Sequence, residues 1–249
     1  MGLAWRTIAR LRTAGVRETG RVVAKNVVFY GRRYYCSRVD RRYGIDTSGR
    51  HELESLDTVG GNKAYGVYFE PSPEKTVNTV LRHVVERVMP SPDQATFIDY
   101  GSGKGRVIVL AAFFPFRRVV GVEFSKELHD ISTRNVEKIL FGSRDIRCRN
   151  VDSVLADATE YELDDGDLVV FFFNPFLDNV FRSVLKKITE KYTNTRCNIC
   201  IVYYHPQRED LIEETGYFTK VYRGLFTKDF CNPQGRETSI WVTEGLLRR

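Results

Sequence analysis

The 249-residue sequence is poor in cysteine and has no long hydrophobic segment. Its five cysteines are Cys36, Cys148, Cys197, Cys200 and Cys231, an odd number that argues against a disulfide framework and favours a reducing compartment. No apolar run reaches the roughly 18 residues that suggest a membrane-spanning helix. The start of the chain lacks the basic, apolar and small-residue regions of a secretory signal. We therefore expect a cytoplasmic protein.

Positive charge is concentrated in the N-terminal part and scarce elsewhere. Residues 1–46 hold eleven Lys or Arg and three Asp or Glu, whereas the other 203 residues hold 27 basic and 29 acidic residues. The body is thus nearly neutral and lacks the general basicity of a protein that grips a nucleic-acid duplex. Nucleic acid is for this reason an unfavoured partner. The overall composition, 42% hydrophobic and 28% charged, is that of an ordinary globular chain.

The basic N-terminal arm, residues 1–46, has several interpretations. Its apolar residues recur at roughly helical spacing, which predicts one or two helices with a basic face. The arm has the Arg-rich composition of a transit peptide, and peripheral contact with an anionic membrane surface or binding of an acidic partner are alternatives. We favour a helical cap over the ligand site. With the Gly-, Ser- and Thr-rich loop that follows, the arm forms an extension of residues 1–72, ahead of a main domain of residues 73–249.

From residue 73 the pattern changes to strands alternating with helices. Pro73 suits a first helical turn, and the helix that it begins ends before Pro90. The elements expected next are strand 96–100, helix 105–114, strand 118–123, helix 126–140 capped by Ser125, a strand ending near Ala156, strand 167–173, helix 178–192, strand 198–204, helix 208–215, and strands near 217–226 and 237–243. Near-continuous apolar strands indicate a mostly parallel sheet covered on both faces. The last two strands are separated by a turn at 232–235 and predict an antiparallel hairpin at one edge.

The most informative segment is the glycine-rich turn 98–106, with the sequence IDYGSGKGR. It follows the first strand, at the sheet edge where open α/β folds bind ligands. Glu123 ends the next strand and can accept two hydrogen bonds from a ribose diol. Arg106 stands where a dinucleotide fingerprint needs its third small residue, and the P-loop pattern is absent. A dinucleotide-dependent oxidoreductase is therefore the weaker alternative.

The D-x-G-x-G-x-G pattern together with Glu123 resembles motifs I and II of the class I S-adenosylmethionine-dependent methyltransferases, over roughly residues 70–245. The resemblance implies a Rossmann-like α/β fold with a seven-stranded, mostly parallel sheet and S-adenosyl-L-methionine as the cofactor. By position it implies cofactor-binding roles for several residues. For the methionine end these are Asp99 at the amino group, Gly101 and Gly103 at the carboxylate and sulfonium, and Ser102 and Gly105 in the same turn. For the nucleoside they are Glu123 at the ribose, Phe124 at the adenine ring, and Asp157 with Ala158 at the adenine amino group, while Tyr68 and Ser72 belong to a segment that folds over the cofactor. For Asp157, a simple helix cap is the alternative.

The acceptor side is less well specified. Asn174-Pro175-Phe176 follows the strand 167–173, where amine-directed relatives carry [D/N/S]-P-P-[Y/F]. One proline is missing here, so an amine or amide nitrogen acceptor is a hypothesis, and an ordinary strand-end turn is the alternative. His205 follows the strand 198–204 and is the candidate catalytic base or hydrogen-bond donor, with Glu70 as a second base and a structural rim histidine as the other interpretation.

The sequence therefore predicts a methyltransferase that acts on an unidentified protein or small molecule. The alternative is a cofactor-binding or partner-binding protein that acts through its basic N-terminal arm. Cys197 and Cys200 match C-x-x-C, but residues i and i+3 of a strand point to opposite faces, so we expect no metal site.

Overall fold

The computed structural model describes the whole chain except residues 1–2, 50–56, 63–68, 175, 229 and 248–249, and at 3–16 and 32–33 it describes the backbone alone. Within the described residues one sheet is formed by β1 (Thr96–Tyr100), β2 (Arg118–Glu123), β3 (Val151–Leu155), β4 (Leu168–Phe172), β5 (Ile199–Tyr204), β6 (Thr219–Gly224) and β7 (Thr238–Val242). The strand order is β3-β2-β1-β4-β5-β7-β6. Strands β1 to β5 are parallel, and β7 is antiparallel to both β5 and β6. The predicted fold class, including the antiparallel edge hairpin, is confirmed.

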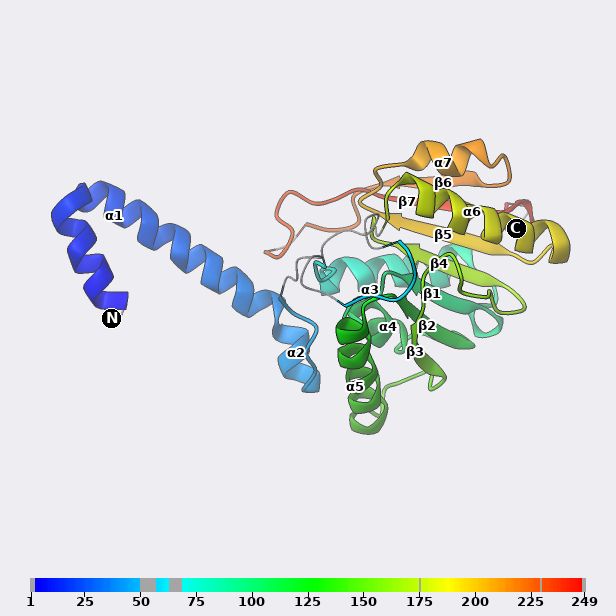
Figure 1. Cartoon of the computed structure of the whole chain (residues 1–249), viewed down its shortest axis with the longest axis horizontal. Coiled ribbons are helices and arrows are strands. Elements are labelled where there is room, and N and C mark those ends of the chain that lie inside the picture. Colours follow the sequence, from blue (N-terminus) through cyan, green and yellow to red (C-terminus); the bar gives the residue numbers. More distant parts are fainter. Residues whose placement is uncertain (1–2, 50–56, 63–68, 175, 229, 248–249) are drawn as a thin grey trace.

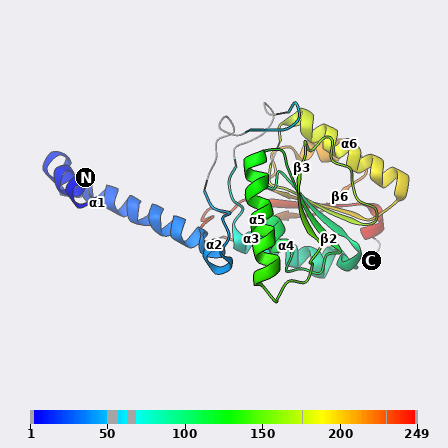
Figure 2. The ribbon, with the colours of Figure 1, turned by 60° about the horizontal axis from the view of Figure 1, so that its bottom comes forward.

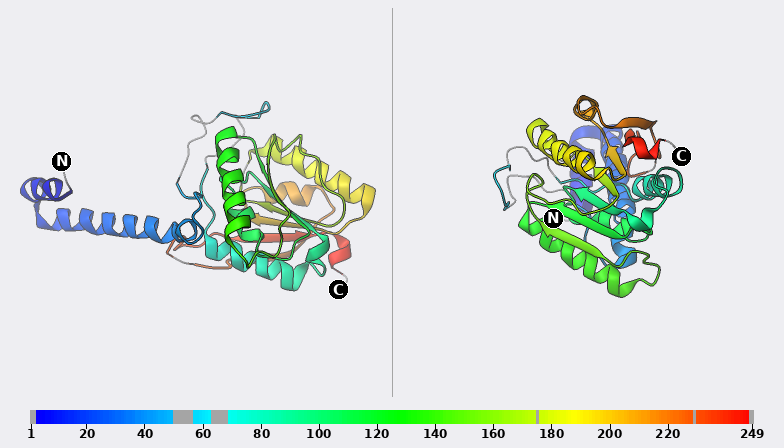
Figure 3. Two further views of the ribbon diagram at one scale, coloured as in Figure 1. Left: turned by 90° about the horizontal axis from the view of Figure 1, so that it is seen from below. Right: turned by 90° about the vertical axis from the view of Figure 1, so that its right-hand side faces the viewer.

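The helices are α1 (Leu3–Cys36), α2 (Arg38–Tyr43), α3 (Glu74–His83), α4 (Arg106–Ala111), α5 (Lys126–Gly142), α6 (Asp178–Thr195) and α7 (Glu209–Glu214), with a π-helical turn at Val84–Val88 and 3-10 turns at Pro92–Gln94 and Glu244–Leu246. Helices α3, α4 and α5 pack their apolar side chains on one face of the sheet, and α6 and α7 cover the other face. Figure 3 shows these two layers. Neighbouring residues of β1 enter different cores, Phe97 on one side and Ile98 on the other, because side chains alternate along a strand.

Most local predictions are confirmed to within a few residues. Pro73 is the residue that precedes α3, and the Ser125 hydroxyl accepts a hydrogen bond from the Leu128 amide at the start of α5. The helix predicted at 105–114 is shorter in the structure, where α4 spans Arg106–Ala111. The Asn232 carbonyl accepts a hydrogen bond from the Gly235 amide, which confirms the turn between the last two strands.

The basic N-terminal arm is helical, but α1 does not cover the sheet. Figures 1 and 2 both show α1 extending away from the body, which corrects the prediction of a helical cap. The physical reason lies in its contacts. The described structure joins α1 to the body at its C-terminal end, through Cys36 and the Tyr35–Phe230 ring contact. The segment after α1 is anchored by Val39, which is fully buried, and by the Asn135 side-chain amide, which hydrogen-bonds to the backbone N–H and carbonyl of Asp46. No described helix has a stretch that is apolar enough and long enough to cross a bilayer.

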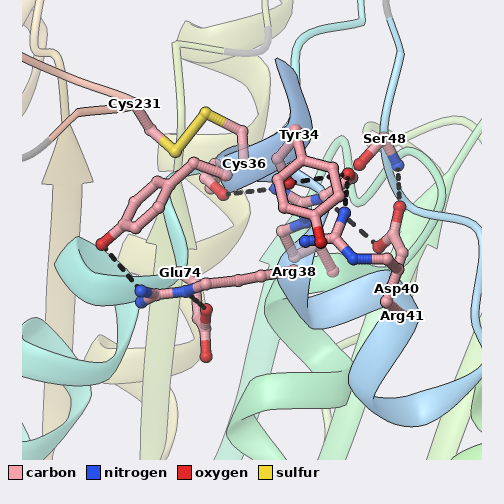
Figure 4. The surroundings of a disulfide bond; sticks show 12 residues. Tyr34, Cys36, Arg38, Asp40, Arg41, Ser48, Glu74 and Cys231 are labelled. Atoms are coloured by element: carbon pink, nitrogen blue, oxygen red, sulfur yellow. Dashed lines mark hydrogen bonds and ion pairs between the residues drawn. A yellow bond between two sulfur atoms is a disulfide. The ribbon is translucent and has the colours of Figure 1, made fainter. Parts of the chain in front are cut away.

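A disulfide joins Cys36, at the end of α1, to Cys231 in the β6–β7 connection. Figure 4 shows it beside the Arg38–Glu74 ion pair. The prediction drawn from the odd cysteine count is wrong for this pair. Sequence spacing could not reveal it, since 195 residues separate the two cysteines and only the fold brings them together.

Candidate functional site

One pocket opens at the carboxyl edge of β1, β2 and β4. It encloses about 1270 Å³ between protein atoms, its open mouth included. The following sequence-predicted residues line it: Ser72, Asp99, Gly101, Ser102, Gly103, Glu123, Phe124, Asp157, Ala158, Asn174, Phe176 and His205. Residues predicted from separate motifs are thus brought together in one cavity. Tyr68 and Pro175 lie outside the described residues.

Gly105 is the predicted cofactor residue that does not line the pocket. Its φ of +81° lies in the left-handed region, and a Cβ added there would lie 2.4 Å from the Ser132 hydroxyl of α5. Gly105 therefore allows the helix that follows the turn to pack closely against α5, which is a structural role.

The glycine-rich turn is held against the end of β2. The Gly101 and Ser102 amides both donate to the Val122 carbonyl, at 2.9 and 3.1 Å. Gly103 has a φ of +55°, and a Cβ on it would lie 2.3 Å from the ring of Phe69. Glycine is required at this position for both the backbone angle and the close approach of that ring.

Glu123 is tied to the same turn. Its carboxylate accepts hydrogen bonds from the Gly103 amide at 2.7 Å and from the Ser125 amide at 2.9 Å. The side chain is 3% exposed, and this burial raises the pKa of Glu123 to about 7, although the backbone donors oppose the rise. The carboxylate thus links the end of β2 to the turn after β1.

Asp99 is the second buried carboxylate of the pocket and is also 3% exposed. Among the described residues, none donates a hydrogen bond to its carboxylate. Burial, together with the nearby Glu123 carboxylate, raises the pKa of Asp99 well above its ordinary value. A buried carboxylate without a donor favours a cationic or hydrogen-bond-donating ligand. This chemistry fits the ammonium group of an amino-acid ligand such as the methionine end of S-adenosylmethionine.

Asp157 lines the pocket and also caps a turn. One carboxylate oxygen accepts from the amide of Thr159, at 2.9 Å, which caps the turn that follows β3. The other oxygen accepts from the Asn62 amide at 2.8 Å, and Asn62 also lines the pocket. Gly60 passes so close that a Cβ would lie 2.4 Å from the Asp157 carboxylate. Sequence reasoning missed Asn62, whose loop is placed only by this tertiary contact.

Asn174 and His205 lie at the opposite end of the pocket. Each comes two residues after a paired position, since Phe172 of β4 pairs with Tyr203 of β5. Both have positive φ values, +44° and +57°, which non-glycine residues rarely adopt and which often mark functional sites. The Asn174 side-chain oxygen accepts a hydrogen bond from the Tyr203 hydroxyl at 3.1 Å.

An ion pair closes this end of the pocket. The Arg236 guanidinium donates to both carboxylate oxygens of Glu70, at 3.1 Å each, and stacks over the Phe173 ring. Burial and the Arg236 cation lower the pKa of His205, and Glu70 opposes this effect. The imidazole is therefore neutral at pH 7 and able to accept a proton. Arg236 was not predicted, because it lies in a connection far from the recognised motifs.

Arg106 is the residue whose presence in the turn argues against a dinucleotide site. Its side chain also lines the pocket, although it is only 4% exposed. Its guanidinium donates to the Thr47 and Ser48 hydroxyls, at 2.7 and 2.9 Å, and to the Ser72 carbonyl. It therefore anchors two loops to the turn. Within the part of the chain that the structure describes, no three His, Cys, Asp or Glu side chains converge as metal ligands.

Several solved methyltransferase structures are similar to this chain at low identity. Magnesium protoporphyrin IX methyltransferase from Synechocystis, with bound S-adenosylmethionine, is 13% identical, with a TM-score of 0.47 over 69% of this chain and 79% of that one. A glycopeptide N-methyltransferase complexed with S-adenosylmethionine is 10% identical, with a TM-score of 0.47 over 66% and 85%. A putative RNA methyltransferase from Pyrococcus horikoshii is 17% identical, with a TM-score of 0.47 over 76% and 90%. No protein-family model and no curated protein matches the sequence.

These similarities are too weak to carry a functional argument, and the topology is the firmer observation. The seven-stranded, mostly parallel sheet, the antiparallel β7 and the glycine-rich turn after β1 agree with what the sequence implied, and the structure adds the strand order β3-β2-β1-β4-β5-β7-β6. The chain therefore has a Rossmann-like α/β fold with a seven-stranded, mostly parallel sheet.

Proposed function

We propose that this protein binds S-adenosylmethionine and transfers its methyl group to an acceptor. The observation that carries the proposal is the pair of buried carboxylates, Asp99 and Glu123, that line one pocket beside a turn of left-handed glycines. One carboxylate lacks a donor among the described residues and the other is held by backbone amides. Such a pocket suits a ligand with an ammonium group at one point and a diol at another.

The residues of the pocket supply complementary chemistry for each part of the cofactor. Asp99 would bind the ammonium group, and the backbone around Gly101 and Gly103 would lie beside the methionine carboxylate. Glu123 would accept hydrogen bonds from the ribose hydroxyls. Phe124 and Asp157 would contact the adenine ring and its amino group. When bound, S-adenosylmethionine supplies an electrophilic methyl group on a sulfonium centre.

The chain's own contribution is to orient the acceptor and to handle its proton. Methyl transfer is a direct displacement, so positioning provides most of the rate enhancement. His205 is neutral at pH 7 and would accept the proton of a hydroxyl or an ammonium acceptor. The Phe173 and Phe176 rings would exclude water from that end of the pocket.

The hydrogen bonding of Asn174 supports one class of acceptor atom. An amide oxygen has two lone pairs, and here one of them is engaged by the Tyr203 hydroxyl. One lone pair remains for an acceptor N–H, which supports the hypothesis of an amine or amide nitrogen. A hydroxyl acceptor is the second candidate, favoured by the neutral imidazole of His205. A radiolabelled methyl-transfer screen over amines and alcohols would distinguish the two.

The direct test is calorimetric titration of the full chain with S-adenosylmethionine and with S-adenosylhomocysteine. We expect micromolar binding, reduced at least tenfold by Glu123→Ala. Glu162→Ala removes a carboxylate that is 92% exposed and serves as the matched control with unchanged affinity. Absence of binding by folded wild-type protein, or equal affinity of Glu123→Ala, would remove the proposal.

A further inference from the structure

The exposed helix α1 carries a row of apolar side chains on one side and, on the other, a row of basic side chains with the exposed Val28 and Phe29 among them. Val23, Val27, Tyr30 and Tyr34 recur at intervals of four, three and four residues, so they form one stripe along the helix. Val27 and Tyr34 are 66% and 68% exposed, and the contact over this stripe that the described structure shows is the Arg41 guanidinium, 3.7 Å from the centre of the Tyr34 ring. Large apolar side chains aligned in this way usually mark an interaction surface.

Basic residues occupy the other side. Arg17, Arg21 and Lys25 are exposed and spaced by four residues, so they form a row along the helix. At 100° per residue this row lies about 150° from the apolar stripe. In sequence, α1 contains eight Lys or Arg and one acidic residue, Glu18. We define these two rows, residues 17, 21 and 25 with residues 23, 27, 30 and 34, as the arm surface.

We infer that the arm surface docks on an anionic lipid bilayer. A helix whose polar face is rich in Lys and Arg and whose other face is aromatic and aliphatic binds in the plane of a membrane interface. The apolar stripe would insert at the boundary between the headgroups and the acyl chains, and the basic row would lie among the anionic headgroups. The charge of the arm is complementary to such a surface, whereas the body carries a small negative net charge.

Charge also distinguishes a bilayer from other occupants. A second copy would cover the apolar stripe, but it would leave the basic row, which lies about 150° away, without acidic partners, since Glu18 is the one acidic residue of α1. A nucleic acid would neutralise the arginines and leave the aliphatic side chains Val23 and Val27 without an apolar partner. An anionic bilayer satisfies both sides of α1 at once.

The base of α1 is fixed to the body next to the candidate site. Cys36 ends α1 and is bonded to Cys231, and five residues later Arg236 pairs with Glu70 at the pocket. Docking of the arm would therefore hold the acceptor end of the pocket near the membrane surface. The proposal does not depend on the chemistry of that pocket.

The test is co-sedimentation of the full chain with vesicles of phosphatidylcholine alone and of phosphatidylcholine with about one third phosphatidylglycerol. We expect binding to the anionic vesicles only, and weaker binding at higher salt because the charges are exposed. The double variant Val27→Ser/Tyr30→Ser and the triple variant Arg17→Glu/Arg21→Glu/Lys25→Glu should each lower the partition coefficient at least tenfold. Circular dichroism would confirm that each variant keeps its helix content.

Two control variants match these changes. Phe141→Ser alters an apolar side chain that is 93% exposed on α5, and Lys75→Glu/Arg134→Glu/Lys186→Glu removes exposed cations of the body. Both should bind the anionic vesicles as the wild type does. The proposal is overturned by equal binding to neutral vesicles, by unchanged binding of the folded arm variants, or by a wild-type dimer in light scattering that Val27→Ser/Tyr30→Ser makes monomeric.

Discussion

The Asp40 carboxylate lies 3.3 Å from the Arg106 guanidinium, and the two side chains are 12% and 4% exposed. This ion pair joins α2 to the first residue of α4, next to the glycine-rich turn. Burial lowers the pKa of Arg106, and Asp40 opposes that effect, so the pair keeps a buried cation compensated. The segment that follows α1 is thereby part of the structure that supports the pocket.

Removing one partner of this pair should be costly. We expect Asp40→Ala to lower the free energy of unfolding by about 3 kcal/mol, because the Arg106 cation would stay buried without its carboxylate. Urea denaturation measures this loss. Glu214→Ala, in the exposed pair with Arg182, is the control and should change stability too little to detect. Equal losses in the two variants would contradict the structural role given to Asp40.

Asp99→Asn should stabilise the protein at high pH and weaken cofactor binding. The pKa of Asp99 is raised in the folded state, so the ionised carboxylate destabilises the fold above that pKa, and the penalty disappears as pH falls below the ordinary value. We expect a gain of about 1–3 kcal/mol at pH 8 that shrinks toward pH 4. Unfolding curves at several pH values measure it, with the exposed Asp145→Asn as control. A gain that is independent of pH would refute this explanation.

Gly105→Ala should destabilise the fold through contact with α5. The added Cβ meets the Ser132 hydroxyl at 2.4 Å, and the φ of +81° is unfavourable for alanine, so we expect a loss of about 2–3 kcal/mol. Gly142→Ala, where an added Cβ meets nothing within 4 Å, should cost nothing. Ser132→Ala should restore part of the loss, because the Ser132 hydroxyl has no hydrogen-bond partner in the described structure. Thermal unfolding of Gly105→Ala, Gly142→Ala and the double variant Gly105→Ala/Ser132→Ala measures these differences.

Arg236→Gln should raise the pKa of His205. The arginine lowers that pKa and Glu70 raises it, so removing the cation leaves only the raising influence besides burial. We expect the midpoint of the His205 titration, followed by NMR, to move to higher pH. The acid limb of the pH–rate profile of any methyl transfer should move in the same direction. Arg223→Gln, which removes the Arg223–Glu237 ion pair, is the control and should leave the titration in place. An unshifted titration in Arg236→Gln would show that the two groups are not coupled.

Thiol counting tests the disulfide. Denatured, unreduced protein should titrate three thiols, from Cys148, Cys197 and Cys200, and reduced protein should titrate five. Closing a loop of this length stabilises a fold by about 5 kcal/mol in the chain-entropy description, so Cys231→Ser should unfold at lower denaturant concentration. Five thiols in protein purified without reductant would show that Cys36 and Cys231 do not pair.

The sequence by itself determined the local elements and several residues that line the pocket. The boundaries of β1 and β2 were predicted to the residue, because buried strands are short apolar runs with clear ends. Asp99 lies one residue before the end of β1 and Glu123 ends β2, and the D-x-G-x-G-x-G pattern together with Glu123 singled both out. Their convergence followed from the rule that parallel strands present their carboxyl ends at one edge.

Tertiary structure alone decided the contacts between distant segments. The Cys36–Cys231 disulfide, the Glu70–Arg236 ion pair and the Asp40–Arg106 pair join residues that are 195, 166 and 66 positions apart. No periodicity or short motif encodes such pairs, since they depend on how whole elements pack. The direction of α1 is of the same kind: its helical pattern is local, but its position away from the sheet depends on which side chains find a partner in the body.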